Sequence, residues 1–266
     1  MSLIFHVPAI DPIAFSFGFV AIRWYSLAYI FGILAALIFL KKANKDYQIM
    51  SKEAEEDWLT WAILGIILGG RIGYILFYNF SFYIENPLDI LKIWQGGMSF
   101  HGGLLGVIFA MFVFCKKNQI NFLKLTDILS VIAPVGIFFG RLANFINMEL
   151  YGRITNSENY GFIFSTIDNQ KRHPSQLYEA FFEGVLLFII LLSLRKWQNF
   201  PKNDGILSGI FIILYSLARM FVEQFREPDA HLGFVIHNIT MGQMLSLPIF
   251  IFGLGLVIFR IKEKRE

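Results

Sequence analysis

Long apolar stretches recur along the whole chain and alternate with short polar segments. Each stretch is close to the roughly 20 residues that a helix needs to cross about 30 Å of hydrocarbon. The pattern predicts an all-α, polytopic integral membrane protein with about seven transmembrane helices. We place these helices near residues 17–40, 58–79, 97–114, 125–144, 177–194, 205–225 and 239–259.

The segments between the stretches differ in charge. Every second segment is rich in Lys and Arg, with fourteen such residues in total, whereas the opposite segments hold five. Cytoplasmic loops are enriched in these residues, so we expect the N-terminus outside and the C-terminus in the cytoplasm. The fourteen are Lys41, Lys42, Lys45, Lys52, Lys116, Lys117, Lys124, Arg195, Lys196, Lys202, Arg260, Lys262, Lys264 and Arg265, and the five are Lys92, Arg153, Lys171, Arg172 and Arg226.

The two longest connections lie on the expected outer side. Residues 145–176 are polar and aromatic, and we expect them to form a small cap on the outer face. Residues 80–97 contain an Asn-Pro and a Gly-Gly pair, which favour a turn or a re-entrant entry into the third span. No internal repeat is evident, so we expect a single membrane domain over residues 1–266, without the inverted repeats of many transporters.

Composition supports a membrane protein. The 266 residues are 56% hydrophobic and 16% charged, with a mean hydropathy of +0.56, whereas soluble domains carry about 25% charged residues. The isoelectric point near 8.9 does not indicate nucleic-acid binding, because the basic residues lie in short clusters between spans. Cys115 is the only cysteine, which excludes an internal disulfide and a cysteine-based metal cluster, and we expect neither a metal nor a cofactor. No Lys or Arg precedes Arg23 and Asp11 interrupts the apolar start, so we expect no cleaved leader.

Four of the 23 basic residues fall within the predicted spans, namely Arg23, Arg71, Arg141 and Arg219. An arginine near the bilayer centre costs about 2.5–3.5 kcal/mol, so it requires a partner, a water-filled cavity or a ligand. Arg23 begins a span, and we expect it to reach the interface. Arg71 lies on a glycine stripe suited to close helix packing, and either structural hydrogen bonds to a neighbouring helix or a functional role fits it.

Polar groups are dense where the fourth span ends. Between Gly140 and Arg153 lie two arginines, two amides and a carboxylate. Arg141 and Asn144 are three residues apart and share a helical face. A guanidinium fits a phosphate bidentately, and an amide offers both a donor and an acceptor to ester or glycerol oxygens. The alternative is a buried structural pair between Arg141 and Glu149.

The sixth span carries a polar stripe on an otherwise apolar helix. Tyr215, Arg219 and Glu223 follow one another at intervals of four and therefore line one face. Glu223 is placed to hold Arg219 while leaving some guanidinium donors for an anionic ligand. The alternative is that the Arg219–Glu223 pair only locks the helix bundle.

Two histidine segments are also candidates. His101 lies among four glycines at the start of the third span, and its ordinary pKa of about 6.5 suits a general base near neutral pH. A structural hydrogen bond is the alternative. The segment from His173 to Glu179 opens the fifth span with turn and N-cap chemistry, which predicts helix initiation.

Other functional classes fit these residues less well. A transporter or channel also places Arg and Glu within the membrane, but the chain has no duplicated half. A different phospholipid-dependent transferase would keep the arginines and require another acceptor. An intramembrane protease would need a Ser–His or paired-Asp arrangement on neighbouring spans, which the sequence does not contain.

The same motifs resemble the prolipoprotein diacylglyceryl transferases of bacteria. The run from Gly140 to Gly152 matches that family's signature, with Ala143 in a position that accepts Gly or Ala. The likeness extends across the chain in order and spacing, through Arg23-Trp24-Tyr25, Gly69-Gly70-Arg71, Phe100-His101-Gly102-Gly103, His173-Pro174-Ser175-Gln176-Leu177-Tyr178-Glu179 and Tyr215 to Asp229.

The resemblance implies transfer of the sn-1,2-diacylglyceryl group from phosphatidylglycerol to the lipobox cysteine of a prolipoprotein, the first step of bacterial lipoprotein maturation. The products are a thioether and glycerol phosphate. The resemblance also implies a multi-pass protein of the bacterial cytoplasmic (inner) membrane, with phosphatidylglycerol, prolipoproteins and the lipid bilayer as partners. The residues it implicates in activity or lipid binding match Tyr25, His101, Arg141, Asn144, Glu149, Tyr215, Arg219 and Glu223.

The residue types in these motifs suit the transfer reaction that the resemblance implies. A free cysteine thiol has a pKa of about 8.5, so a base or a positive potential must promote its deprotonation. Preorganised donors stabilise the charge that grows on a departing phosphate. We therefore expect Arg141 and Arg219 to bind phosphate, His101 to act as the base, and three residues to orient the groups: Asn144, Glu149 and Glu223.

Overall fold

The computed structural model describes residues 3–18, 20–197, 204–228, 233–236 and 239–263. Lys202, Asp229, Lys264 and Arg265, which entered the sequence analysis, lie outside the described residues. The fold is mostly helical, and six helical segments are long and apolar enough to cross a membrane. These segments are α1 (Trp24–Tyr47), α2 (Lys52–Tyr78), α4 (Phe100–Lys117), α5 (Phe122–Ile146), the run Ser175–Trp197 and α9 (Met241–Glu263).

The sixth predicted span corresponds to a shorter apolar helix, α8 (Ile206–Val222), which has 17 residues. A polytopic membrane protein is therefore correct, while the count of seven crossings stays a prediction. The chain groups into two compact units, residues 1–40 with 126–266 and residues 41–125. The single membrane domain also stays a prediction.

The first span begins later than predicted. Residues before Trp24 form an antiparallel hairpin of β2 (Ile13–Phe17) and β3 (Val20–Arg23) instead of the first turns of a helix. Alternating aromatic and β-branched residues favour a strand there even though the segment is apolar overall. Arg23 is consequently the exposed last residue of β3, immediately before α1.

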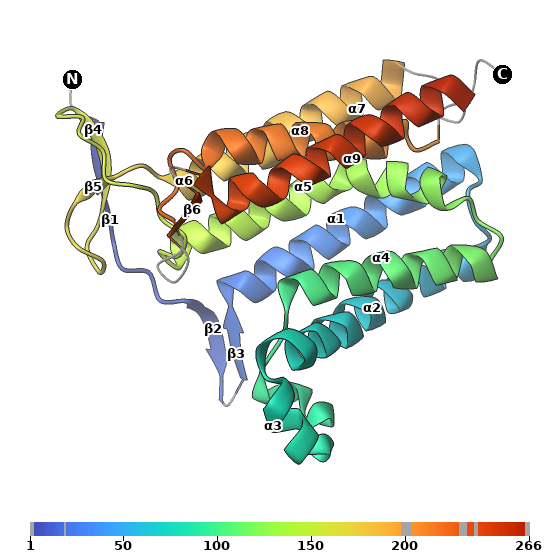
Figure 1. The fold of residues 1–266 in the computed structure, drawn as a ribbon, viewed down its shortest axis with the longest axis horizontal. Helices are drawn as coiled ribbons and strands as arrows, with labels where there is room; N and C mark the ends of the chain where they lie inside the picture. The colour runs from blue at the N-terminus through green and yellow to red at the C-terminus, as the bar shows by residue number, and fades with distance from the viewer. Residues whose placement is uncertain (1–2, 19, 198–203, 229–232, 237–238, 264–266) are drawn as a thin grey trace. The chain divides into compact units, whose positions relative to one another are not determined.

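The unit of residues 41–125 is built on two helices, α2 and α4, that lie side by side (Figure 1). Their contact surface consists of glycines, because a Cβ atom added at Gly69 would lie 2.6 Å from the Cα atom of Gly106 and one at Gly73 would lie 2.7 Å from the Cα atom of Gly102. The predicted small-residue stripe is thus confirmed. Between these helices come α3 (Phe80–Glu85) and two short 3-10 turns, η1 (Pro87–Leu91) and η2 (Ile93–Gln95).

In the larger unit, the predicted fifth span is one continuous helical run with a change of pitch. It starts as α6 (Ser175–Glu179), widens into the π-helical segment η3 (Ala180–Leu186) and continues as α7 (Leu187–Trp197). Helix α8 packs against α9 and α7 (Figure 1).

A buried carboxylate holds the start of α8. The first amide groups of a helix have no partner within the helix and need an outside acceptor. Asp127 of α5 is fully buried and accepts hydrogen bonds from the amides of Gly205 and Ser208, each at 2.7 Å, and from the Ser208 hydroxyl at 2.7 Å. This contact connects α5 to α8, the two helices that carry the predicted arginine sites.

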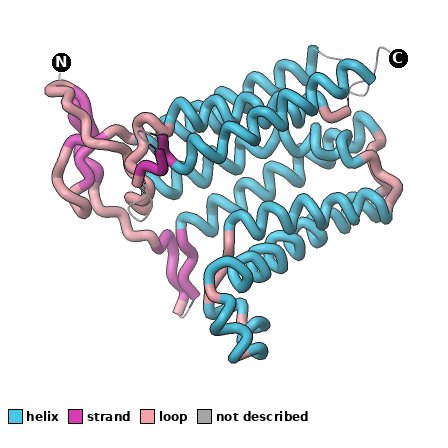
Figure 2. The backbone as a smooth tube through the Cα atoms, in the orientation of Figure 1, coloured by secondary structure: helices cyan, strands magenta, loops and turns pink. Residues whose placement is uncertain are grey.

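Short strands, which the sequence analysis did not predict, complete the larger unit. A three-stranded sheet has the order β1-β4-β5, with β1 (Leu3–Val7) parallel to β4 (Tyr160–Phe164) and β5 (Lys171–Arg172) antiparallel to β4. β6 (Phe234–Ile236) pairs with β7 (Ile239–Thr240). Figure 2 shows these strands beyond one end of the unit's helices. Two strands thus belong to residues 145–176, the segment expected to form a cap.

Candidate active site

Arg219 and Glu223 lie on one face of α8 and contact each other, as their spacing predicts. The Nη2 atom of Arg219 lies 2.6 Å from the Oε2 atom of Glu223, one helical turn further along. Both side chains are largely buried. The Thr240 hydroxyl at the end of β7 donates a hydrogen bond of 3.0 Å to the Oε1 atom of Glu223, which fixes the carboxylate from its other side.

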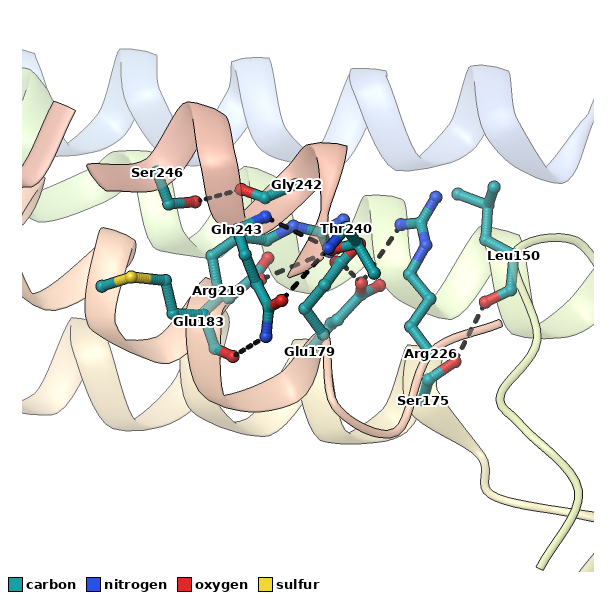
Figure 3. Close-up of polar contacts among 12 residues, drawn as sticks. Leu150, Ser175, Glu179, Glu183, Arg219, Arg226, Thr240, Gly242, Gln243 and Ser246 are labelled. Atoms are coloured by element: carbon teal, nitrogen blue, oxygen red, sulfur yellow. Dashed lines mark hydrogen bonds and ion pairs between the residues drawn. The ribbon is translucent and has the colours of Figure 1, made fainter. Parts of the chain in front are cut away.

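A single carboxylate, Glu179, connects three arginines. Its side chain is fully buried, and its oxygens lie 3.2 Å from Arg141 Nε and 3.2 Å from Arg226 Nη1. It also accepts a hydrogen bond from Arg219 Nη1. Figure 3 shows Glu179 between Arg219 and Arg226. One carboxylate therefore sets the positions of guanidinium groups from α5, α8 and the segment that follows α8.

Glu183 lies one turn beyond Glu179 and faces the same arginines. Its Oε2 atom accepts a hydrogen bond of 3.2 Å from Arg141 Nη2, and its Oε1 atom lies 3.8 Å from Arg219 Nη1. Glu183 belongs to the π-helical segment η3, and π-bulges are frequent at functional sites. Gly184 allows η3 to approach α5, because a Cβ atom there would lie 2.8 Å from the Cβ atom of Phe138.

The two central arginines keep donors for a ligand. Within the described part of the chain, Arg141 Nη1 and Arg219 Nε have no hydrogen-bond or ion-pair partner. Their side chains remain 17% and 13% exposed, so the cluster is not sealed. Tyr215 lies close enough to Arg141 and Glu183 to interact with them electrostatically. A guanidinium held on one side with free donors on the other suits an anionic ligand.

A second polar group adjoins Arg141 on α5. The amide of Asn144, which is 3% exposed, donates hydrogen bonds to the Tyr25 hydroxyl at 2.5 Å and to Glu149 Oε2 at 3.4 Å. Asn147 donates to the other oxygen of Glu149 at 3.4 Å. Arg141 and Asn144 therefore lie on one helix, as predicted, and the side chains of Asn144, Tyr25 and Glu149 meet where α5 ends.

The turn after α5 is held by the start of α6. Met148 and Leu150 both have a φ of 55°, a left-handed conformation that non-glycine residues seldom adopt. Gln176 donates a side-chain hydrogen bond of 2.7 Å to the Glu149 carbonyl, and Ser175 donates one of 3.0 Å to the Leu150 carbonyl. The segment from His173 to Glu179 thus begins a helix, as predicted, and also stabilises the turn that presents Glu149.

Gly152 lies in a position with no space for a side chain. A Cβ atom there would lie 2.7 Å from the carbonyl oxygen of Phe225 and closer still to that of His173.

Arg172 donates a hydrogen bond of 2.9 Å to the Gly152 carbonyl and forms ion pairs with Asp168 at 2.5 Å and with Glu227 at 3.1 Å. The hydrogen bond from Arg172 lowers the pKa of Asp168, and burial lowers the pKa of His173.

Arg71 is satisfied entirely within the smaller unit. It is 4% exposed, and its guanidinium donates to backbone carbonyls of the segment between α3 and α4, with distances from 2.6 to 3.3 Å. The structural alternative is therefore correct for Arg71, although the acceptors lie in a connection and not on a neighbouring helix. The acceptors are Asp89, Ile90, Lys92, Gly96 and Gly97.

His101 also belongs to the smaller unit. It is exposed in the first turn of α4, which Ser99 caps by accepting the Gly102 amide at 3.2 Å. Its ring lies edge-on to Phe100, with centroids 5.6 Å apart. The residues around Arg141 and Arg219 are in the other unit, so the expectation that His101 acts with them stays a prediction.

The family model for prolipoprotein diacylglyceryl transferases matches residues 12–259. The chain belongs to this family. It is 53% identical over 253 residues to the phosphatidylglycerol–prolipoprotein diacylglyceryl transferase of Rickettsia bellii (strain OSU 85-389), covering 94% of this chain and 95% of that protein. The proteins of the same name from Rickettsia felis and Rickettsia typhi are 52% and 50% identical over 251 and 259 residues, with 96% and 99% of their lengths covered and 94% and 97% of this chain.

Two acidic residues of this diacylglyceryl transferase family member are not predicted as site residues by the sequence. The sequence pattern assigns Glu179 to a helix start and gives no role to Glu183. The proposed alternative partner of Arg141 was wrong, because its ion pairs are with Glu179 and Glu183 and not with Glu149. The available signal was two carboxylates four residues apart in an apolar span, which require basic partners.

Among the described residues of the family member, no group of three or more His, Cys, Asp or Glu is arranged to hold a metal ion. Ion pairs join three arginines and three glutamates around Glu179 in the larger unit: Arg141, Arg219, Arg226, Glu179, Glu183 and Glu223. We call these six residues the Arg–Glu cluster.

Proposed function

We propose that this protein transfers the sn-1,2-diacylglyceryl group of phosphatidylglycerol to the lipobox cysteine of a prolipoprotein, as the first step of lipoprotein maturation. Membership of the family and relatives of the same length that carry this activity in their names support the proposal. The observation that carries it is the Arg–Glu cluster, in which Arg141 and Arg219 are fixed by buried carboxylates and still have free donors.

The reaction forms one bond and breaks one. The cysteine sulfur attacks the glycerol carbon that bears the phosphate, and the bond between that carbon and the phosphate oxygen breaks. The electron pair of this bond leaves with the phosphate, which departs as glycerol phosphate, and the thiol proton passes to the general base. Because charge grows on the departing oxygen, donors fixed in advance stabilise the transition state more than the substrate.

Arg141 and Arg219 are the proposed phosphate ligands. Carboxylates hold each guanidinium from one side, so few rotamers are lost when the phosphate binds the remaining donors. Glu223 orients Arg219 directly through a contact of 2.6 Å. Tyr215 lies beside the same groups and contributes a hydroxyl to lipid binding.

Tyr25, Asn144 and Glu149 are the proposed ligands of the uncharged part of the headgroup. Their hydroxyl, amide and carboxylate already form one hydrogen-bonded group next to Arg141. Glycerol hydroxyls and ester carbonyls need both donors and acceptors, which this set supplies. His101 is the proposed general base for the thiol, since an imidazole exchanges protons near neutral pH.

We further propose a bacterial cytoplasmic-membrane protein with seven crossings, an outside N-terminus and a cytoplasmic C-terminus. The unequal distribution of Lys and Arg between alternate loops supports this orientation. Residues 145–176 then form a cap on the outer face, and the lipid substrate enters from the surrounding bilayer.

The direct test is transfer to a peptide. Purified protein in phosphatidylglycerol vesicles is incubated with a synthetic lipobox peptide, and mass spectrometry should detect a diacylglyceryl group on the cysteine. A peptide with the cysteine replaced by alanine should gain no mass. No mass increase on the cysteine peptide, or an equal increase on both peptides, would contradict the proposed function.

The phosphate role of Arg141 is tested by a matched pair of variants. Arg141→Lys removes the planar fork that binds Glu179, Glu183 and a phosphate, so kcat/KM should fall by about 100-fold or more. Arg23→Lys changes an exposed arginine at the end of β3 and should keep activity within about twofold, because a surface position lacks that geometry. Equal losses in the two variants would reject Arg141 as a phosphate ligand.

A further inference from the structure

Glu183 is the least compensated carboxylate of the Arg–Glu cluster. Its side chain is fully buried, and only its Oε2 atom accepts a hydrogen bond, from Arg141 at 3.2 Å. The Oε1 atom is inaccessible, accepts no hydrogen bond within the described residues, and lies 3.8 Å from Arg219. Burying a carboxylate oxygen without a donor is costly when the group is ionised.

The other two carboxylates have closer partners. Glu179 contacts three guanidinium groups, those of Arg141, Arg219 and Arg226. Glu223 lies 2.6 Å from Arg219 and also accepts the hydroxyl of Thr240. Nearby positive charge and hydrogen-bond donors stabilise an ionised carboxyl group, and Glu183 has the fewest of them at short distance.

The six side chains of the cluster, counted by themselves, carry no net charge when all are ionised, because three arginines and three glutamates sum to zero. A phosphodiester adds one negative charge, which would be uncompensated in a buried site where charges are weakly screened. One proton on a glutamate gives the cluster a charge of +1, which matches the phosphodiester.

The neighbours of Glu183 direct this proton to it. The charged and titratable groups that face it are Arg141 from α5, Tyr215 and Arg219 from α8, and Glu179 from α6. A phosphate that binds the free donors of Arg141 and Arg219 places a second anion on the two guanidinium groups that Glu183 faces. The approach of a second anion favours the neutral acid.

We propose that Glu183 takes up one proton when a phospholipid phosphate binds to Arg141 and Arg219, so that the occupied cluster carries no uncompensated charge. The inference rests on the proposed function. The proton comes from solvent, and only the O–H bond of the Glu183 carboxyl group forms. Glu183 is thereby a positioning residue that couples lipid binding to pH, and it touches the arginines and not the reacting carbon.

Calorimetry without a peptide substrate tests this coupling. A short-chain phosphatidylglycerol is titrated into the intact protein in phosphatidylcholine nanodiscs, in buffers that differ in ionisation enthalpy, at several pH values around neutrality. The dependence of the heat on the buffer measures the protons taken up. The wild type should take up about one proton near neutral pH, and above the pKa of Glu183 its affinity should fall about tenfold per pH unit.

Glu183→Gln should bind the lipid without proton uptake and with an affinity that changes little with pH. Glu158→Gln, which alters an exposed glutamate that is not part of the cluster, should behave as the wild type does. Glu183→Asp keeps a carboxyl group and should restore proton uptake. No uptake in the wild type, or unchanged uptake in Glu183→Gln, would overturn the inference.

Peptide transfer measured on the same preparations separates this inference from the proposed function. A wild-type protein that transfers the diacylglyceryl group and binds the lipid without taking up a proton contradicts only the role of Glu183. A wild-type protein that neither transfers nor binds contradicts the proposed function. If Glu183→Gln does not fold, the proton uptake measured for the wild type and for Glu183→Asp still tests the inference.

Discussion

The four arginines that the hydropathy pattern places within spans have very different surroundings. Arg71 gives its donors to backbone carbonyls and is thereby structural. Arg23 is exposed at the end of a strand. Arg141 and Arg219 share buried carboxylates and keep free donors. Of the four, Arg141 and Arg219 are therefore the buried arginines whose guanidinium groups remain partly available to a ligand.

The proposed general-base role of His101 is tested by the pH dependence of the reaction. His101→Asn should lower kcat at neutral pH by roughly 10²-fold or more, the usual size of a general-base contribution. The rate should recover as the pH approaches about 8.5, where the thiol ionises without help. The measurement is the pH profile of kcat for peptide transfer.

His6→Asn, a change in the exposed strand β1, serves as the control for His101 and should keep the wild-type profile. A loss in His101→Asn that is equal at all pH values would assign the histidine a structural role.

At the scale of elements, the helical run from Ser175 to Trp197 carries two buried carboxylates, which its high hydrophobicity does not indicate. Its first half is a short α-helix followed by a π-helical segment, and these carry Glu179 and Glu183 toward the same arginines. The spacing of the two carboxylates was visible in the sequence. Their partners on α5 and α8 were not, because local spacing does not specify which helices become neighbours.

The glycine contact between α2 and α4 makes a direct prediction about stability. Gly69→Ala adds a methyl group that would lie 2.6 Å from the Cα atom of Gly106, so the two helices must separate. Such overpacking should lower the free energy of unfolding by about 1–3 kcal/mol. Thermal unfolding in detergent measures the change.

The matched control is Gly255→Ala in α9, where an added Cβ atom has no neighbour within 4 Å. The higher helix propensity of alanine should leave this variant as stable as the wild type or more stable by up to about 1 kcal/mol. Equal destabilisation of both variants would show that the loss in Gly69→Ala does not come from helix contact.

At the scale of the molecule, contacts between distant segments build the part of the fold that the sequence left open. β1 pairs with β4 from Leu3 opposite Tyr160 to Val7 opposite Phe164. Val7, Met148 and Phe164 form a small core beneath this sheet. Strands of two to five residues have too little periodicity to be predicted, and their partners lie more than 150 residues away in the chain for β1 and β4.

The predicted orientation in the membrane is a property of the whole chain and is tested by labelling. In a Cys115→Ala background, single cysteines replace Glu158 and Lys117, which are both exposed. A membrane-impermeant thiol reagent added to intact cells should label the cysteine at 158 and spare the one at 117, because the latter lies at the lysine-rich end of α4, which the proposed orientation places in the cytoplasm.

Both cysteines should react once the membrane is permeabilised, which confirms that each is accessible. Labelling of position 117 in intact cells, with position 158 protected, would reverse the proposed orientation.

The sequence by itself determined that the chain is a helical membrane protein and that Tyr215, Arg219 and Glu223 share one helix face. These properties follow from hydrophobic length and helical spacing, which are local. Only the tertiary structure decided that Glu179 joins three arginines, that Glu183 is poorly compensated, and that the chain's first strand belongs beside residues 160–164. These contacts depend on which helices and strands pack together, and that packing is determined by interactions along the whole chain.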